Sequence, residues 1–151
     1  MKVLLLNGSP RKNGCTYTAL NVVADALKAE GIDVEVFQAG DPDMENVKAA
    51  AAKLKESDAL VVGSPVYWAS PSGQIIEFMD RLASVAGKDM LYKPAAAVAS
   101  ARRAGTTATL DVLTKYFSYH QMPVVSSCYW NMVHGNAPEE VMRDEEGVQI
   151  M

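Results

Sequence analysis

Short apolar runs alternate with segments of helical periodicity along this chain, and no other feature limits its fold as strongly. The wholly apolar run at residues 3–6 is typical of a parallel strand that is buried on both faces. In residues 16–28, apolar side chains recur at the spacing of one helical stripe, and Gly31 follows as a stop. The same alternation predicts strands at residues 34–37, 59–62 and 95–99, a last strand that begins at residues 123–126, and helices around residues 47–54, 75–83 and 110–117.

Five strands joined by four helices favour a doubly wound parallel sheet of the α/β class, because right-handed crossovers place helices on both faces. A dinucleotide-binding fold needs G-x-G-x-x-G after its first strand and an acid about 20 residues further on, but the second strand here ends in Phe37-Gln38. A Walker A loop needs a lysine that the first loop lacks before Thr16. The sequence therefore predicts a single flavodoxin-like domain over residues 1–151, with a five-stranded sheet in the order 2-1-3-4-5 and a ligand site between strands one and three.

Composition and charge limit the classes of function. A chain of 151 residues with 49% hydrophobic and 21% charged residues is long and apolar enough for one folded core. A net charge of −4 gives no support for a nucleic-acid or membrane-surface partner. No apolar run approaches the ~20 residues of a membrane span, and the run before Asn7 is too short for a signal peptide, so we expect a cytoplasmic protein. Its two cysteines, Cys15 and Cys128, fit neither a disulfide framework nor a zinc site, and no metal is expected.

The loop after the first strand, NGSPRKNGCT (residues 7–16), has the composition of an anion site. The hydroxyls of Ser9 and Thr16 and the last amides of the loop can surround a phosphate at the start of the first helix, where free amides and the helix dipole favour negative charge. Arg11 or Lys12 can add a charge-assisted hydrogen bond. An ordinary turn with two solvated cations is the alternative interpretation.

The loop after the third strand, GSPVYWASPSG (residues 63–73), carries Tyr67 and Trp68. Aromatic side chains at the carboxyl end of a strand suit a flat ring, and the backbone amides beside them can reach the polar edge of an isoalloxazine. The alternative is that Trp68 packs down on the domain as ordinary loop core. Together with the phosphate loop, this segment predicts a site for flavin mononucleotide (FMN).

The loop after the fourth strand, SARRAGTT (residues 100–107), has Gly105 for close approach and two adjacent cations, Arg102 and Arg103. One arginine can stabilise negative charge on a reduced flavin, and the other can meet a phosphate of a nicotinamide nucleotide. Two solvated loop cations are the alternative. The pair favours NADPH over NADH.

These three motifs resemble the flavodoxin-like NAD(P)H-dependent FMN reductase family, to which quinone reductases and iron–sulfur flavoproteins are related, and the similarity runs along most of the chain. The resemblance implies FMN as cofactor, NAD(P)H as co-substrate and a homodimer or homotetramer, since flavin sites in this family lie near subunit interfaces. It implies that the FMN phosphate lies on Ser9, Arg11, Asn13, Cys15 and Thr16. It places the ring against Pro65, Val66, Tyr67 and Trp68 and against a loop that includes Ser100, Ala101, Arg102 and Gly105.

Two features depart from the family pattern. Iron–sulfur members have a cysteine-rich segment between strand two and helix two, whereas residues 38–43 contain no cysteine, so we expect a member without a cluster. The family also has a helix after strand five, and without it the sheet face beside helix one would be half uncovered. We therefore expect further residues after Met151, and also after Gly40, in the full protein. A partner subunit that covers this face is the alternative.

The sequence predicts an FMN-dependent NAD(P)H oxidoreductase that passes hydride through the bound flavin to a quinone, a flavin or another small acceptor. The flavin performs this chemistry, so no catalytic side chain is expected. Two alternatives stay open: a flavodoxin-type electron carrier, and a flavin-binding sensor without nicotinamide turnover. The cations of the first and third loops argue against a carrier, because carriers of this type usually lack arginine in the phosphate loop.

Overall fold

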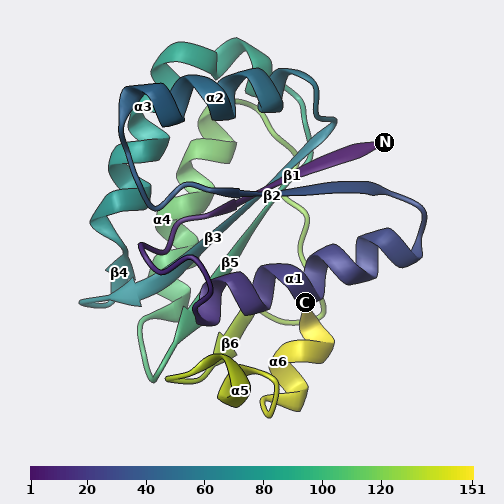
Figure 1. The fold of residues 1–151 in the computed structure, drawn as a ribbon, viewed down its shortest axis with the longest axis vertical. Coiled ribbons are helices and arrows are strands. Elements are labelled where there is room, and N and C mark those ends of the chain that lie inside the picture. The colour runs from purple at the N-terminus through teal and green to yellow at the C-terminus, as the bar shows by residue number, and fades with distance from the viewer.

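A parallel sheet with helices on both faces forms the centre of the computed structural model, which describes residues 1–151 (Figure 1). Its strands are β1 (Lys2–Asn7), β2 (Asp33–Gln38), β3 (Ala59–Tyr67), β5 (Ala95–Ala101) and β6 (Met132–His134). They lie in the order β2-β1-β3-β5-β6, and all neighbours pair in parallel. The two-residue strand β4 (Ser70–Pro71) folds back antiparallel on the end of β3. Apart from β4, this is the predicted order, and the flavodoxin-like fold is confirmed.

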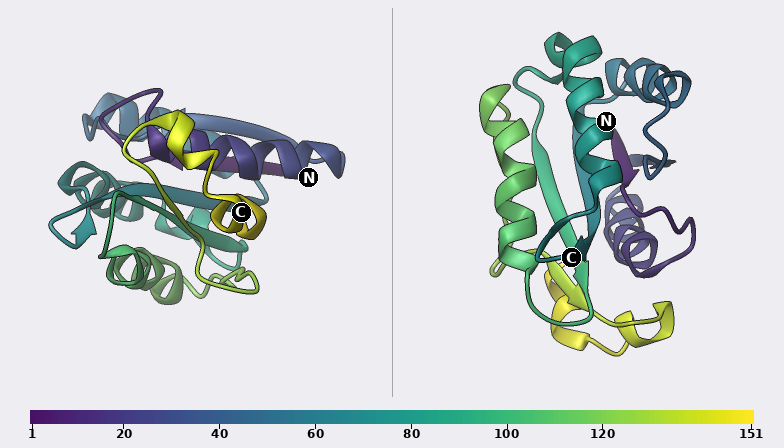
Figure 2. Two further views of the ribbon diagram at one scale, coloured as in Figure 1. Left: turned by 90° about the horizontal axis from the view of Figure 1, so that it is seen from below. Right: turned by 90° about the vertical axis from the view of Figure 1, so that its left-hand side faces the viewer.

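Four helices follow the strands as the periodicity predicted, and two short helices that it did not predict follow β6. They are α1 (Cys15–Ala29), α2 (Met44–Lys55), α3 (Gly73–Met90), α4 (Thr106–Tyr119), α5 (Pro138–Val141) and α6 (Glu145–Ile150). Figure 2 shows α1, in purple, and α4, in green, on opposite sides of the sheet. None of the six combines the length and the hydropathy that a membrane span requires.

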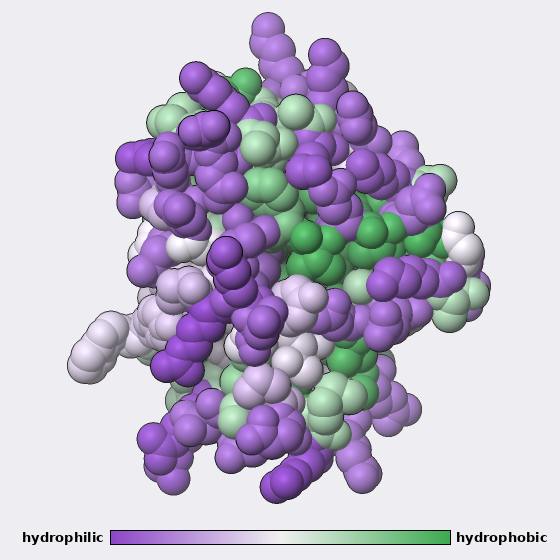
Figure 3. All heavy atoms as spheres, in the orientation of Figure 1, coloured by the Kyte–Doolittle hydropathy of each residue, from purple (hydrophilic) through white to green (hydrophobic).

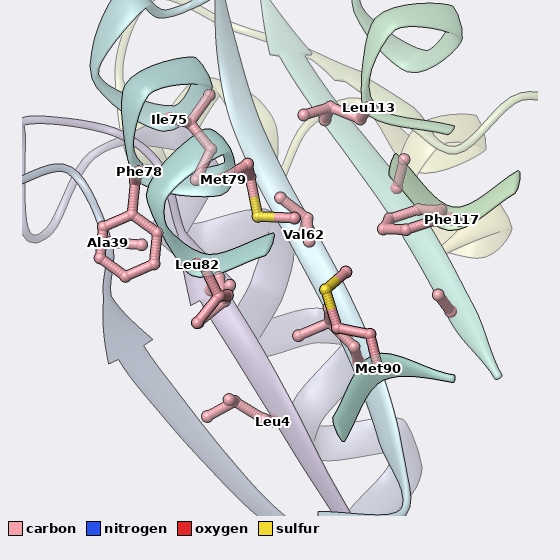
Figure 4. Close-up of a cluster of buried hydrophobic side chains, with 14 of the residues drawn as sticks. Leu4, Ala39, Val62, Ile75, Phe78, Met79, Leu82, Met90, Leu113 and Phe117 are labelled. Carbon is pink, nitrogen blue, oxygen red and sulfur yellow. The ribbon is translucent and has the colours of Figure 1, made fainter. Parts of the chain in front are cut away.

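The alternation of side chains along β1 divides the core into two clusters. Leu4 and Leu6 face one side of the sheet, while Val3 and Leu5 face the other, as the two-residue period of a strand requires. Helices α2, α3 and α4 pack on the first side, and α1 and α5 pack on the second. Figure 4 shows the larger cluster, in which side chains of α3, among them Met79, lie over the sheet.

The predicted start of the last strand at residues 123–126 is right only for a single bridge to β5, and the strand itself forms later in the chain. Only Val124 pairs there, as an isolated bridge to Ala95. The chain then leaves the sheet and returns as β6, whose Met132 pairs with Ala99. Val124 and Met132, the partners of Ala95 and Ala99, lie farther apart in sequence than Ala95 and Ala99 do. The additional residues between Val124 and Met132 therefore loop out from the sheet edge and are exposed.

The sheet face beside α1 is only partly covered. Val141 of α5 joins the smaller core cluster, and α6 follows next to it. Beside them a groove of about 360 Å³ is lined mainly by apolar side chains, among them Val61 and Val98. Figure 3 shows a further apolar band over the edge strand β2, where Val34 and Val36 are partly buried. Val61 and Val98 are nevertheless buried, and the expectation that further residues cover this face stays a prediction.

Candidate functional site

The three predicted loops meet at the carboxyl ends of β1, β3 and β5. A cavity of about 200 Å³ opens between the β1–α1 loop, the β3–β4 hairpin and the β5–α4 loop. Figure 1 shows the start of α1, the β3–β4 turn and β6 at this end of the sheet. Ten of the thirteen predicted site residues line the cavity: Ser9, Arg11, Cys15, Thr16, Pro65, Val66, Tyr67, Ser100, Ala101 and Arg102. A wider surface groove of about 650 Å³ lies between α3 and α4, and none of these loops lines it.

Internal hydrogen bonds give the β1–α1 loop its shape. The amide of Ser9 donates to Oδ1 of Asn7 at 3.2 Å, and the amide of Arg11 donates to Oγ of Ser9 at 3.1 Å. The hydroxyl of Ser72 donates to the carbonyl of Gly8 at 2.8 Å from the neighbouring loop. The hydroxyl proton of Ser9 is not used by these bonds, so Ser9 can still donate into the cavity that it lines.

Gly8 allows this loop to lie directly against β3. Its amide donates to the carbonyl of Gly63 at 2.8 Å. A Cβ atom at Gly8 would lie 2.6 Å from that carbonyl oxygen and 2.6 Å from Cβ of Ile75. Since neither neighbour can withdraw from the core, a side chain at this position would push the loop away from the sheet.

Helix α1 begins without a side-chain cap, unlike α2 and α3, which Asp43 and Ser72 cap. Its N-cap is Gly14, and the amides of Cys15 and Thr16 donate to no other residue. Unpaired amides at a helix start attract an anion, an effect that the helix dipole strengthens. The cavity therefore has, at one end, the donor set that a phosphate needs.

A buried hydrogen bond joins the first loop to the third. Oγ1 of Thr16 and Oγ of Ser100 lie 2.7 Å apart, and the two residues are 1% and 3% exposed. This bond holds the start of α1 against the end of β5. Both residues line the cavity, so two loops that are far apart in sequence contribute to one wall.

Cys15 connects the cavity to a segment that the sequence analysis missed. Its thiol donates to the carbonyl of Gly135 at 3.6 Å, and Gly135 and Asn136 line the cavity beside it. Burial raises the pKa of the Cys15 thiol, which favours the neutral thiol over the thiolate. A Gly-Asn turn after a strand is the signal that identifies these two residues, and misplacing the last strand at residues 123–126 hid it.

The β3–β4 hairpin holds Trp68 in solvent. Tyr67 pairs with Ser70, and the turn residues Trp68 and Ala69 have φ angles of 51° and 57°. Left-handed backbone is costly for residues other than glycine and often marks functional turns. The Trp68 side chain is 100% exposed, so the alternative in which it packs as loop core is wrong. Gly105, with φ of 102°, packs under this turn, where a Cβ would lie 2.7 Å from Cα of Ala69.

The charges at the cavity are positive. Arg11 and Arg102 line it, and neither forms an ion pair with a carboxylate. Asn13 and Arg103 are exposed on the adjoining loops and lie outside the cavity wall, as do Trp68 and Gly105. No three His, Cys, Asp or Glu side chains lie close enough together to hold a metal ion. The site therefore offers two unpaired guanidinium groups to an anionic ligand.

Comparison with known proteins identifies the family to which this chain belongs. The family model described as NADPH-dependent FMN reductase matches residues 1–137. An iron-sulfur flavoprotein of Methanocaldococcus jannaschii is 29% identical over an alignment of 175 positions, which takes in 99% of this chain and 91% of the relative. An NADPH azoreductase of a Bacillus species is 30% identical over 108 residues, which cover 67% of this chain and 59% of the relative.

A solved structure, the Trp repressor binding protein of Bacillus subtilis, matches 97% of this chain and 96% of its own with a TM-score of 0.78. Its sequence identity is 19%, so this similarity concerns the fold alone. The family model, by contrast, covers most of the sequence. The chain therefore belongs to the NADPH-dependent FMN reductase family, as its motifs indicated, and is a flavoprotein oxidoreductase with FMN as its cofactor.

Proposed function

We propose that this protein transfers hydride from NADPH through FMN to a small acceptor, such as a quinone, a free flavin or a nitro compound. The observation that carries the proposal is the cavity in which three loops, an uncapped helix start and two unpaired arginines meet. FMN, when bound, supplies the redox chemistry itself: it takes up hydride and passes electrons on. The protein then has to bind, orient and tune the cofactor.

The β1–α1 loop is proposed to hold the phosphate of FMN. The amides of Cys15 and Thr16, the hydroxyl of Ser9 and the guanidinium of Arg11 supply donors along one wall of the cavity. Asn13, on the exposed part of the same loop, lies close enough in sequence to add its amide. Backbone donors at a helix start together with one cation are a common phosphate site.

The β3–β4 hairpin is proposed to bind the flavin ring along Pro65, Val66 and Tyr67. A volume of about 200 Å³ is below that of most cofactor sites, which enclose roughly 300–1,000 Å³, so we expect part of the cofactor to stay open to a second substrate. Trp68 at the hairpin turn and Ala101 and Gly105 at the third loop would border that opening.

Arg102 and Arg103 are proposed to favour NADPH over NADH. Arg102 lines the cavity and Arg103 is exposed beside it, so both can reach a nucleotide that approaches from solvent. The cavity wall contains no carboxylate or imidazole, and hydride transfer between nicotinamide and flavin needs none. Positive charge at this place suits a reduced, anionic flavin.

Three expectations remain part of the proposal. The protein acts on small molecules as a homodimer or homotetramer, and the exposed Trp68 beside the cavity is a suitable anchor for a partner subunit. It acts without an iron–sulfur cluster, because Cys15 and Cys128 alone cannot supply the four thiolates of such a cluster. A cytoplasmic location also stays a prediction.

The test compares oxidation of NADPH and NADH by the FMN-loaded protein with a quinone, a nitro compound and free FMN as acceptors. We expect a preference for NADPH, and we expect Arg102→Ala to raise the KM for NADPH about tenfold while that for NADH changes little. Arg143→Ala, which removes an exposed cation of the C-terminal segment, is the matched control. Bound FMN without oxidation of either nucleotide would contradict the proposal and favour an electron carrier or a sensor.

A further inference from the structure

Gln38 ends β2 at the place where a dinucleotide-binding fold has its acid, and both ends of its side-chain amide are hydrogen-bonded. Its Oε1 accepts from Nδ2 of Asn7 at 2.7 Å, and its Nε2 donates to the carbonyl of Ser9 at 2.6 Å. These two bonds fix the orientation of the amide, because exchange of its oxygen and nitrogen would break both. Gln38 itself does not line the cavity.

Asn7 extends this network along the β1–α1 loop. Its Oδ1 accepts from the amide of Ser9 at 3.2 Å, and its Nδ2 also donates to the carbonyl of Lys12 at 3.3 Å. Asn7 is 1% exposed, so its polar atoms depend on these partners. Gln38 and Asn7 therefore hold the loop at Ser9, where it leaves β1, and again at Lys12, before α1.

The backbone after Gln38 packs directly against the β1–α1 loop. A Cβ atom at Gly40 would lie 2.0 Å from the carbonyl oxygen of Ser9, so only glycine fits there. Asn46 of α2 donates to the carbonyl of Gln38 at 3.0 Å, and the amide of Ala39 donates to the carbonyl of Asn7 at 2.8 Å. The support for the loop is thus itself anchored to the sheet and to α2.

We propose that Gln38 is a positioning residue that makes the flavin site select for a phosphate. By holding the carbonyl of Ser9 toward β2, it keeps the hydroxyl of Ser9 available to the cavity that this residue lines. The inference rests on the proposed phosphate site in this loop. A glutamate at this position cannot donate to the Ser9 carbonyl and brings a negative charge toward a phosphate, and a methionine makes neither bond.

The test measures dissociation constants for FMN and for riboflavin, which lacks the phosphate, in the wild type and in Gln38→Met. Loss of two neutral hydrogen bonds predicts that FMN binds about tenfold more weakly while riboflavin binding changes by less than about twofold. Gln149→Met, which alters an exposed glutamine on α6, is the matched control and should leave both constants unchanged. Gln38→Glu keeps the side-chain size and is predicted to lower the preference for FMN further; it also serves if Gln38→Met does not fold.

The possible outcomes separate the two proposals. If the wild type binds FMN no better than riboflavin, the phosphate site itself is wrong. If the wild type prefers FMN and the Gln38 variants keep that preference, the positioning role is wrong. An equal loss of affinity for both ligands would indicate a merely structural role and would also overturn the inference.

Discussion

Removing the hydroxyl of Thr16 is expected to destabilise the protein through the partner that it leaves behind. Thr16 and Ser100 are almost fully buried, and their oxygens lie 2.7 Å apart. In Thr16→Val the hydroxyl of Ser100 stays buried without that partner, which costs about 2 kcal/mol of unfolding free energy. For a domain of this size, that loss lowers the melting temperature by roughly 4–8 °C.

A double-mutant cycle isolates this contact. Urea unfolding of Thr16→Val, Ser100→Ala and the double variant gives three free-energy differences from the wild type. Removing both hydroxyls leaves no unpaired group, so the double variant should be more stable than the sum of the single losses predicts, by about 1 kcal/mol. Thr107→Val, an exposed change in the first turn of α4, is the control and should alter stability by less than about 0.5 kcal/mol.

Additive losses would refute the reasoning. If the coupling between Thr16 and Ser100 stays within the ~0.3–0.5 kcal/mol of independent sites, the two hydroxyls share no bond in solution. The start of α1 and the end of β5 would then not meet as described, and the cavity between the first and third loops would lose its main support.

The remaining predictions concern pH, reactivity and packing. The hydrogen bond from Lys53 to Glu35, with Lys2 nearby, lowers the pKa of Glu35 below its ordinary 4.5, so the stabilisation is present above pH 4.5 and is lost as the pH falls through the lower folded value. Thermal melts should therefore show a gap between wild type and Glu35→Gln that closes in acid; a gap that persists there would contradict the assignment. Because burial raises the pKa of Cys15, iodoacetamide at neutral pH should alkylate the exposed Cys128 first, and mass spectrometry that finds Cys15 modified first would oppose this. Phe78→Ala leaves a cavity in the larger core cluster, where Phe78 is fully buried, and should cost about 3–5 kcal/mol in urea unfolding; a loss under ~1 kcal/mol would mean that the site is not tightly packed.

Local patterns predicted most of the fold because each of the central strands β1, β3 and β5 contains an unbroken apolar run. Along β1, every second side chain enters a different cluster, so an unbroken apolar run was a reliable signal. The same reasoning failed for the last strand. Val124 and Val125 look like a strand start in sequence, but both are exposed, and Val133 is the buried residue of the strand that forms. Both segments touch β5, and which of them extends beyond a single bridge into a strand depends on tertiary contacts that the pattern does not contain.

The candidate site was predicted to a similar extent. The three loops that line the cavity were identified because strand ends and loop composition are local signals. The orientation of Trp68 depends on a left-handed turn without glycine, which composition does not indicate. In the sequence, Gln38 indicated only that the second strand does not end in an acid. Its proposed role depends on a hydrogen bond to a loop 29 residues away in sequence. Such contacts arise from the sheet order, which brings β2 next to β1.

The most direct test of the account is the visible spectrum of the purified protein after loading with FMN and removal of free flavin, followed by NADPH without oxygen. The account predicts that the flavin band stays with the protein and bleaches when NADPH is added. Flavin that stays bound but keeps its colour would contradict the oxidoreductase reaction with nicotinamide. Flavin that washes away entirely would contradict the site at the three loops.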